Sequence, residues 1–292
     1  MSYPRPSTEL SLNYAASPGP LPGSGLPADA RLARMATLNG APVELEDLKA
    51  LALVNYGHFT SMRIDDGHVR GLSLHMDRLV RDCRAVFDVG LDPDRVLRFA
   101  RQAVGGKTGS FVVRVTIFDP ALEMGHPGSD AEPQILVTTR PAGAMPPPPM
   151  RVRSFPFARD SAAIKHTGLF SQLRLRRQAQ REGFDDALFA DTHGVISEGG
   201  TWNVAFYDGT DVIWPTADVL PGVTMHLLQQ AHESVTAPVT LDMLPRMQAA
   251  FATNTSIGVR PISAIDGQAL NAGHYILTEL QQQYLQIPGE EL

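Results

Sequence analysis

Strand-like and helix-like hydrophobic patterns alternate along the first half of the chain. Three segments rich in β-branched or aromatic residues are typical of strands, namely 59–64, 111–118 and 134–139. Apolar residues recur at three- and four-residue spacing over 74–87 and, more weakly, over 92–104, which predicts two helices. Asn39-Gly40 and Asp66-Gly67 favour tight hairpin turns. These elements predict an antiparallel sheet with helices, an α+β domain over residues 35–141.

Four consecutive prolines interrupt these patterns within residues 142–150. Proline lacks the amide hydrogen and favours an extended run, so we interpret this segment as a linker. Residues 151–292 are therefore predicted to form a second domain. Within it, helical patterns cover three segments. The first runs from shortly after Lys165 to Glu182, and the others are 223–232 and 273–285. Strand-like patterns cover 187–191 and 203–207.

Residues 1–34 are rich in proline and glycine, which fix or free the backbone at many points and oppose regular structure. We interpret them as a flexible N-terminal arm. Within the arm, Leu10, Leu12 and Tyr14 alternate with other residues as they would in a short strand.

Composition and charge narrow the possible functions. The 25 basic and 31 acidic side chains are scattered along 292 residues, so the sequence offers no basic face to nucleic acid. No apolar run approaches the roughly 20 residues that span a bilayer, and the N-terminus lacks the pattern of a secretory signal. The single cysteine cannot form an internal disulfide, and the nine histidines show no metal-ligand spacing. We expect a cytoplasmic protein without a metal site that acts on small molecules.

Lys165 stands alone in a mostly apolar stretch, and Glu198 begins a Gly-rich turn after a strand-like segment. A lysine buried without a carboxylate partner has a lowered pKa, and its free amine can form a Schiff base. A carboxylate can keep the pyridine nitrogen of pyridoxal phosphate protonated. Taken alone, Lys165 is better explained as a half-exposed surface lysine, and Glu198 is equally well explained as a turn glutamate that faces water. Together they favour a pyridoxal phosphate site.

Phosphate binding has candidates of its own. Pro221-Gly222 precedes a predicted helix, so the amides of Val223 and Thr224 point out of its N-terminus, where an anion is stabilised. The same residues could cap a helix that has no ligand. Thr255 lies in a hydroxyl-rich turn, and Arg78 lies off the apolar face of its predicted helix, free for a phosphate or for solvent.

In this order the segments resemble the class IV aminotransferases, the fold-type IV pyridoxal-phosphate enzymes that include branched-chain aminotransferase, D-amino-acid aminotransferase, (R)-selective amine transaminases and aminodeoxychorismate lyase. The resemblance runs from about Leu38 to Ile262 and rests on five separated motifs. It implies a two-domain α/β fold with a smaller N-terminal α+β domain and a larger C-terminal domain built on a mixed, barrel-like sheet. It also implies a homodimer with the cofactor at the domain interface.

The resemblance implies roles for individual residues. Lys165 matches the Schiff-base lysine, and Glu198 matches the partner of the pyridine nitrogen. The family's phosphate-binding positions are matched by Arg78, Val223, Thr224 and Thr255. Ser256 falls where the family's second turn approaches the substrate.

The sequence also departs from the family pattern. Phe170 stands where the aminotransferases commonly have a tyrosine, and Lys165-His166 looks more like the lyase. The segment 119–139, which often shapes the family's substrate pocket, contains no Arg or Lys, and this favours an apolar amino acid or an amine as donor. A second substrate carboxylate would need Arg63, Arg114 or a residue of a partner chain. The substrate-pocket candidates are Phe59, Arg63, Arg114, Phe170, Trp202 and Ser256.

The sequence thus predicts a pyridoxal 5′-phosphate-dependent aminotransferase. It would move an amino group from an amino acid or amine to a 2-oxo acid or ketone by a ping-pong mechanism, through a Schiff base on Lys165. The alternative is a lyase of the aminodeoxychorismate type, which eliminates and releases pyruvate. A third hypothesis is a binding protein that keeps the scaffold without the cofactor.

Overall fold

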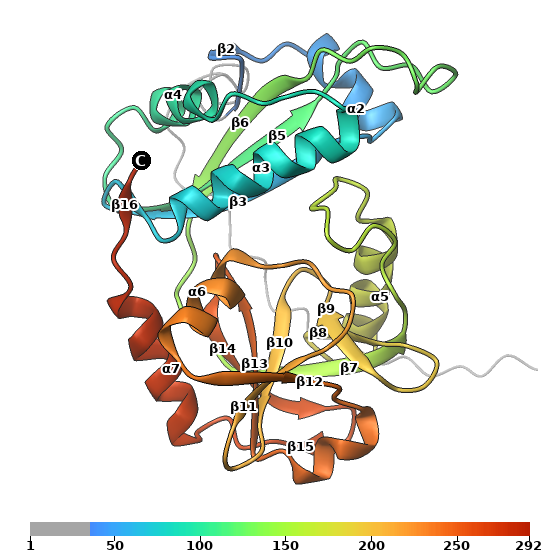
Figure 1. Cartoon of the computed structure of the whole chain (residues 1–292), viewed down its shortest axis with the longest axis vertical. Coiled ribbons are helices and arrows are strands. Elements are labelled where there is room, and N and C mark those ends of the chain that lie inside the picture. Colours follow the sequence, from blue (N-terminus) through green and yellow to red (C-terminus); the bar gives the residue numbers. More distant parts are fainter. Residues whose placement is uncertain (1–35) are drawn as a thin grey trace, which may run out of the picture.

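The computed structural model describes residues 36–292, and Figure 1 shows two sheets, one above the other along the long axis. The first sheet is antiparallel, with the strand order β16-β4-β3-β5-β6-β1-β2. Its strands are β1 (Ala36–Leu38), β2 (Ala41–Pro42), β3 (His58–Asp65), β4 (His68–Val69), β5 (Ser110–Phe118), β6 (Gln134–Pro141) and β16 (Glu290–Glu291). The C-terminal strand β16 therefore returns to the sheet that the N-terminal half builds.

Alternation along β3 and β5 gives the first sheet two different faces. Met62 on β3 and Val115 on β5 point into a core that the sheet shares with helices α3 (Leu72–Phe87) and α4 (Pro93–Val104). Successive side chains point to opposite faces of a strand, so Phe59 and Arg114 lie on the face away from these helices. The short helices η1 (Glu46–Leu48) and α2 (Lys49–Leu53) pack against Phe118 on that second face.

The second sheet closes into a six-stranded barrel, because β9 pairs with β10 as well as with β8. The barrel strands are β7 (Met150–Pro156), β8 (Asp186–Ala190), β9 (Ile196–Gly199), β10 (Asn203–Tyr207), β13 (Ala249–Asn254) and β14 (Gly258–Ile265). Three further strands extend the sheet, namely β11 (Val212–Pro215), β12 (Ser234–Ala237) and β15 (Gln268–Ala269). Buried apolar side chains from these strands form three clusters, one with few helical residues, one shared with the two helices at 223–231 and 275–286, and one shared with the helix at 170–181.

Helices pack on the outside of the barrel. Helix α5 (Phe170–Arg181) contacts β7 and β8, while α6 (Val223–Ala231) and α7 (Tyr275–Gln286) contact each other and β13 or β14. The short helix η2 (Leu241–Arg246) precedes β13. The start of α6 also touches the start of α3, where Gly71 has a φ of +70° and an added Cβ would lie 2.8 Å from Val223 Cγ1. Only glycine allows this close approach without strain.

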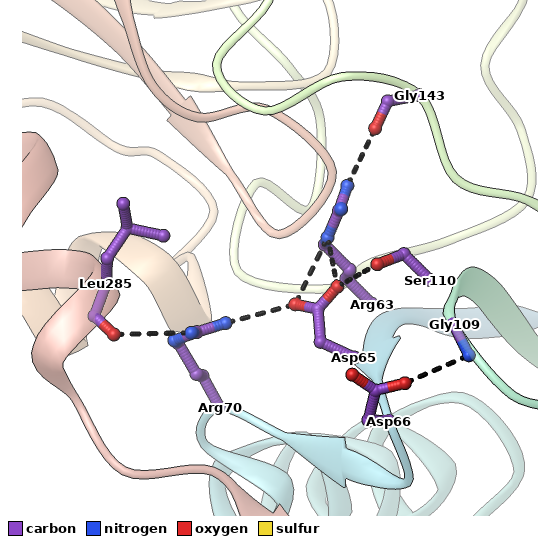
Figure 2. Close-up of polar contacts among 8 residues, drawn as sticks. All are labelled: Arg63, Asp65, Asp66, Arg70, Gly109, Ser110, Gly143 and Leu285. Atoms are coloured by element: carbon purple, nitrogen blue, oxygen red, sulfur yellow. Dashed lines mark hydrogen bonds and ion pairs between the residues drawn. The ribbon is translucent and has the colours of Figure 1, made fainter.

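A cluster around Asp65 fastens the two sheets together (Figure 2). Asp65 accepts hydrogen bonds from Arg63 Nε at 2.9 Å and from Arg70 Nη1 at 3.1 Å. Arg63 Nη1 also donates to the carbonyl of Gly143, in the segment between the sheets, at 2.9 Å. Arg70 Nη2 donates to the carbonyl of Leu285, in the last turn of α7, at 3.3 Å. The first sheet is therefore tied to both the connecting segment and α7.

The predicted helices and first-half strands are confirmed, with shifts of a few residues at their ends. The helix expected shortly after Lys165 begins at Phe170. The hydrophobic pattern does not predict β7, β13 or β14, because β7 directly follows the prolines and half of β13 is alanine. The expected arm over residues 1–34, with its short strand at Leu10, Leu12 and Tyr14, lies outside the described residues. Within residues 36–292, every helix is too short or too polar to cross a membrane.

Candidate active site

A cavity of about 340 Å³ is lined by residues of both sheets and of the loops between them. It brings together predicted site residues that are far apart in the sequence. They are Phe59, Arg78, Arg114, Lys165, Glu198, Trp202, Val223, Thr224, Thr255 and Ser256. Two candidates, Arg63 and Phe170, lie outside it.

Lys165 lies in a loop of the second half that is held by the first half. Its backbone N–H donates to Asp82 Oδ2 on α3 at 3.0 Å, and its carbonyl accepts from Phe59 N on β3 at 2.9 Å. The ammonium nitrogen lies 4.9 Å from the centre of the Phe59 ring. Burial, followed by the charges of Arg78 and Arg159, lowers the pKa of Lys165 from 10.5 to about 7, although Glu198 acts in the opposite direction.

Glu198 lies near the end of β9, and its side chain is 5% exposed. Its Oε1 accepts from Arg159 Nη1 at 3.0 Å, and its Oε2 accepts from the backbone N–H of Leu220 at 3.3 Å. Burial raises the pKa of Glu198, and the charge of Arg159 works against this rise. The next residue is glycine because a Cβ on Gly199 would lie 2.0 Å from the Trp202 ring. The carboxylate is therefore held at a defined place in the cavity wall.

Arg78 is a buried cation without a carboxylate partner among the described residues. It is 6% exposed, and its Nη2 donates to Thr60 Oγ1 at 2.5 Å and lies 3.3 Å from His75 Nδ1. Burial lowers the pKa of Arg78 to about 10, which leaves it charged at neutral pH. Because a buried charge needs compensation, the cavity offers a place for an anion here.

The N-terminus of α6 adds to this anion site. Its first residues, Val223 and Thr224, line the cavity, and no side chain caps the helix at Gly222. A Cβ on Gly222 would lie 2.1 Å from Asn203 Oδ1, so this turn also requires glycine. The free amides and the helix dipole favour a negatively charged group such as a phosphate.

The structure corrects two substrate-pocket candidates. Arg63 does not reach the cavity, because its guanidinium is occupied by Asp65 and by the carbonyl of Gly143 (Figure 2). Phe170 begins α5 with its side chain turned to solvent, 77% exposed. Sequence spacing places both residues near the site. The hydrogen bonds of Arg63 and the position of Phe170 on the exposed side of its helix direct their side chains away from the cavity.

The structure also changes the charge argument about substrates. No residue of 119–139 lines the cavity of its own chain, so the lack of Arg and Lys there does not change the charges that this chain places around the cavity. Arg114 on β5 and Arg140 on β6 do line it, and the sequence did not single out Arg140. Arg159 is a second residue that the sequence did not indicate, because it lies in a loop without a recognisable motif.

A family model described as amino-transferase class IV matches residues 57–265. A curated relative, the putative branched-chain-amino-acid aminotransferase of Methanocaldococcus jannaschii, is 24% identical over 260 residues, which cover 80% of this chain and 88% of that protein. The branched-chain-amino-acid aminotransferase of Escherichia coli K12 is 24% identical over 265 residues, which cover 80% and 86%.

Solved structures share the architecture. The branched-chain aminotransferase from Thermoproteus uzoniensis, solved with norvaline, has a TM-score of 0.77 at 19% identity and covers 86% of this chain and 93% of its own. The T.th. branched-chain amino acid aminotransferase, solved with pyridoxamine 5′-phosphate, has a TM-score of 0.75 at 19% identity and covers 86% and 92%. The predicted α/β fold with a barrel-like sheet is confirmed.

Proposed function

Because the chain belongs to the class IV aminotransferases, we propose that it moves an amino group from an amino acid to a 2-oxo acid with pyridoxal 5′-phosphate as cofactor. One observation carries this proposal: a lysine with a pKa of about 7 shares its cavity with a buried carboxylate and a buried arginine that has no carboxylate partner among the described residues. A cofactor with an aldehyde, a ring nitrogen and a phosphate has one group for each of these residues.

The residues present fit this cofactor. Lys165 Nζ would hold the aldehyde carbon, and Glu198 would face the ring nitrogen. The phosphate would be received by Arg78, Thr255 and the amides that begin α6. When bound, pyridoxal 5′-phosphate supplies a ring that accepts electrons from the substrate carbon carrying the amino group.

Lys165 has the properties of a nucleophile and of a base. At a pKa of about 7, roughly half of its amines are unprotonated at neutral pH, whereas a lysine at 10.5 is almost fully protonated. An unprotonated amine can attack a carbonyl carbon. Once released, Nζ can take the proton from the substrate carbon as a general base. The backbone contacts with Asp82 and Phe59 hold the residue in place for both tasks.

Glu198 supplies a fixed negative charge. An ionised carboxylate beside a ring nitrogen favours the protonated form of that nitrogen. Arg159 opposes the rise in the pKa of Glu198 that burial causes, and so helps to keep the carboxylate ionised. The carboxylate therefore supports the electron-accepting property of the ring.

Arg114 and Arg140 favour substrates with carboxylates. The register of β5 and β6 pairs Val112 with Arg140, which places Arg140 on the same face of the sheet as Arg114. Within the described residues, neither forms an ion pair with a carboxylate. We therefore propose an amino acid and a 2-oxo acid as substrates, which narrows the expectation from the sequence of an apolar amino acid or an amine as donor. Donor and acceptor would occupy this one cavity in turn, as in a ping-pong mechanism.

We also propose that the protein is a homodimer. Phe170 and Leu173, on the first turn of α5, are strongly exposed apolar residues next to Leu169, which lines the cavity. Grouped exposed apolar side chains are typical of protein contacts. A second copy on this surface would lie next to Leu169 and so close to the cavity. Light scattering should give twice the mass of 31.7 kDa, and a monomer at micromolar concentrations would contradict the proposal.

Reductive trapping tests the cofactor assignment. The chain has three lysines, Lys49, Lys107 and Lys165, so peptide mass spectrometry can locate a borohydride-reduced adduct. Addition of pyridoxal 5′-phosphate followed by borohydride should modify Lys165. The Lys165→Arg variant should lose this adduct, and the matched control Lys107→Arg should keep it. Modification at the other two lysines alone would refute the assignment.

A donor and acceptor screen with chiral analysis tests the reaction. Conversion of the bound cofactor to its amine form by amino acids, with the amino group recovered on a 2-oxo acid, supports transamination. Pyruvate release without that conversion supports the aminodeoxychorismate-type lyase instead. Turnover of simple amines with no turnover of amino acids would contradict the proposed substrate class.

A further inference from the structure

Arg159 joins the two central residues of the cavity. It lies in the loop after β7, and its side chain is 7% exposed. One terminal nitrogen, Nη1, donates to Glu198 Oε1 at 3.0 Å. The other, Nη2, donates to the carbonyl of Ile164 at 2.9 Å, in the peptide bond that leads into Lys165. A single planar group therefore spans the carboxylate and the lysine loop.

Only arginine can make both contacts from one side chain. Its guanidinium carries donors in a rigid fork, whereas lysine presents a single charged nitrogen on a flexible stem. Glu198 Oε1 accepts from Arg159 Nη1 at 3.0 Å and Oε2 accepts from Leu220 N at 3.3 Å, so both carboxylate oxygens are anchored and each keeps a lone pair for another donor. The two contacts together fix the orientation of the carboxylate.

We infer that Arg159 is a positioning residue, which holds Glu198 and the Lys165 loop in a fixed relation so that the carboxylate is directed to the ring nitrogen of the cofactor. This inference rests on the proposed function and assigns a role to a residue that does not itself carry out the chemistry.

The charge of Arg159 has a second consequence. Three cations face Lys165 from different elements, Arg78 on α3, Arg159 in its loop and Arg114 on β5, and one anion, Glu198 on β9, opposes them. Removal of one cation raises the pKa of a neighbouring lysine, because the ammonium form is then less disfavoured. Arg159 therefore contributes both geometry and charge.

Two variants separate these contributions. Arg159→Gln removes the charge and the fork, so cofactor binding should weaken about 10- to 100-fold, by analogy with the loss seen when a residue that orients a metal ligand is removed. The pH midpoint for acetylation of Lys165 should also rise. Arg159→Lys keeps a positive charge, so its midpoint should stay near that of the wild type while cofactor binding still weakens.

Arg63→Gln is the matched control. Arg63 also links a carboxylate, Asp65, with a backbone carbonyl, that of Gly143, at 2.9 Å each, but outside the cavity. Its replacement should lower the unfolding temperature while the cofactor affinity and the Lys165 midpoint stay unchanged. Equal effects in the Arg63 and Arg159 variants would mean that Arg159 acts only on overall stability.

The experiment combines two readouts on the full-length chain. Absorbance titration with pyridoxal 5′-phosphate gives the dissociation constant, and brief acetylation at a series of pH values, read by peptide mass spectrometry, gives the Lys165 midpoint. Circular dichroism checks that each variant is folded, and Arg159→Lys serves alone if Arg159→Gln does not fold. Failure of the wild type to bind the cofactor would refute the proposed function. A wild type that binds, with Arg159→Lys binding equally well, would refute the role of Arg159.

Discussion

Replacement of Lys165 by methionine is expected to stabilise the cofactor-free protein at neutral pH. Methionine keeps most of the apolar stem and removes an ammonium group that lies among Arg78, Arg114 and Arg159. The fold disfavours that ammonium, since it lowers the pKa of Lys165 from 10.5 to about 7. The gain in stability measures the free energy by which the fold disfavours the protonated form of Lys165.

The sign and the size follow from linkage between protonation and folding. Between pH 7 and pH 10.5 the unfolded chain binds up to one more proton at Lys165 than the folded chain, so this residue makes wild-type stability rise with pH. Each pKa unit corresponds to about 1.4 kcal/mol, and because the folded amine is already half unprotonated at pH 7, protonation alone gives Lys165→Met an advantage of about 4 kcal/mol at that pH. The advantage falls to about 2 kcal/mol at pH 9.

Urea unfolding at pH 7, 8 and 9 measures this difference. The fluorescence of the two buried tryptophans, Trp202 and Trp214, reports unfolding. Lys49→Met is the control, because Lys49 is exposed and its pKa is raised by its hydrogen bond to Glu46. An advantage of Lys165→Met that does not shrink between pH 7 and pH 9 would refute the linkage argument. A Lys165→Met protein less stable than the wild type at pH 7 would do the same.

Three further outcomes are expected. Asp65→Asn should lower the free energy of unfolding by about 1–3 kcal/mol near pH 6, measured by urea unfolding. Burial raises the pKa of Asp65, but Ser110 and Arg63 hold it below 3.8. The difference in stability between wild type and variant should therefore disappear as the pH falls through the pKa of Asp65 in the folded protein. Gly71→Ala should cost about 1–3 kcal/mol in the same assay, because it combines backbone strain with a clash at α6, whereas Gly67→Ala, with nothing within 4 Å, should cost only the strain. Arg140→Leu should lower kcat/KM for a dicarboxylic acceptor by up to roughly fivefold, since an exposed ion pair contributes about 1 kcal/mol or less. If kcat/KM for the dicarboxylic acceptor, divided by kcat/KM for a monocarboxylic acceptor, does not change, Arg140 does not bind the second carboxylate.

Local patterns in the sequence predict most of the elements around the cavity. The Asn39-Gly40 and Asp66-Gly67 turns and the helix from Leu72 are signalled by residues close together in the chain. β13 is the opposite case, because its alanine-rich sequence has little strand preference, and pairing with β10 and β14 decides its conformation. Closure of the barrel through β9 and β10 likewise depends on contacts that no local pattern encodes.

The candidate site divides in the same way. Lys165, Glu198 and the start of α6 are indicated by the sequence, because each lies at a local feature: an apolar stretch with one lysine, a Gly-rich turn and a Pro-Gly helix start. Their roles remain proposals, but the structure brings them to one cavity. Arg63 and Phe170 fit the sequence argument equally well and lie outside the cavity, since an ion pair and the phase of a helix direct their side chains.

The residue types that the chemistry needs, and the turns and helices that carry them, can be read from the order of the residues, since these features depend on near neighbours in the chain. That Arg140 and Arg159 line the cavity, and that Arg78 has no carboxylate partner among the described residues, follows from the fold. It also decided the pKa of Lys165, because burial and the charges of Arg78, Arg159 and Glu198 come from residues that folding alone brings to the lysine. Electrostatic energy depends on distance in space and on the surrounding dielectric, and neither is written in the order of the residues.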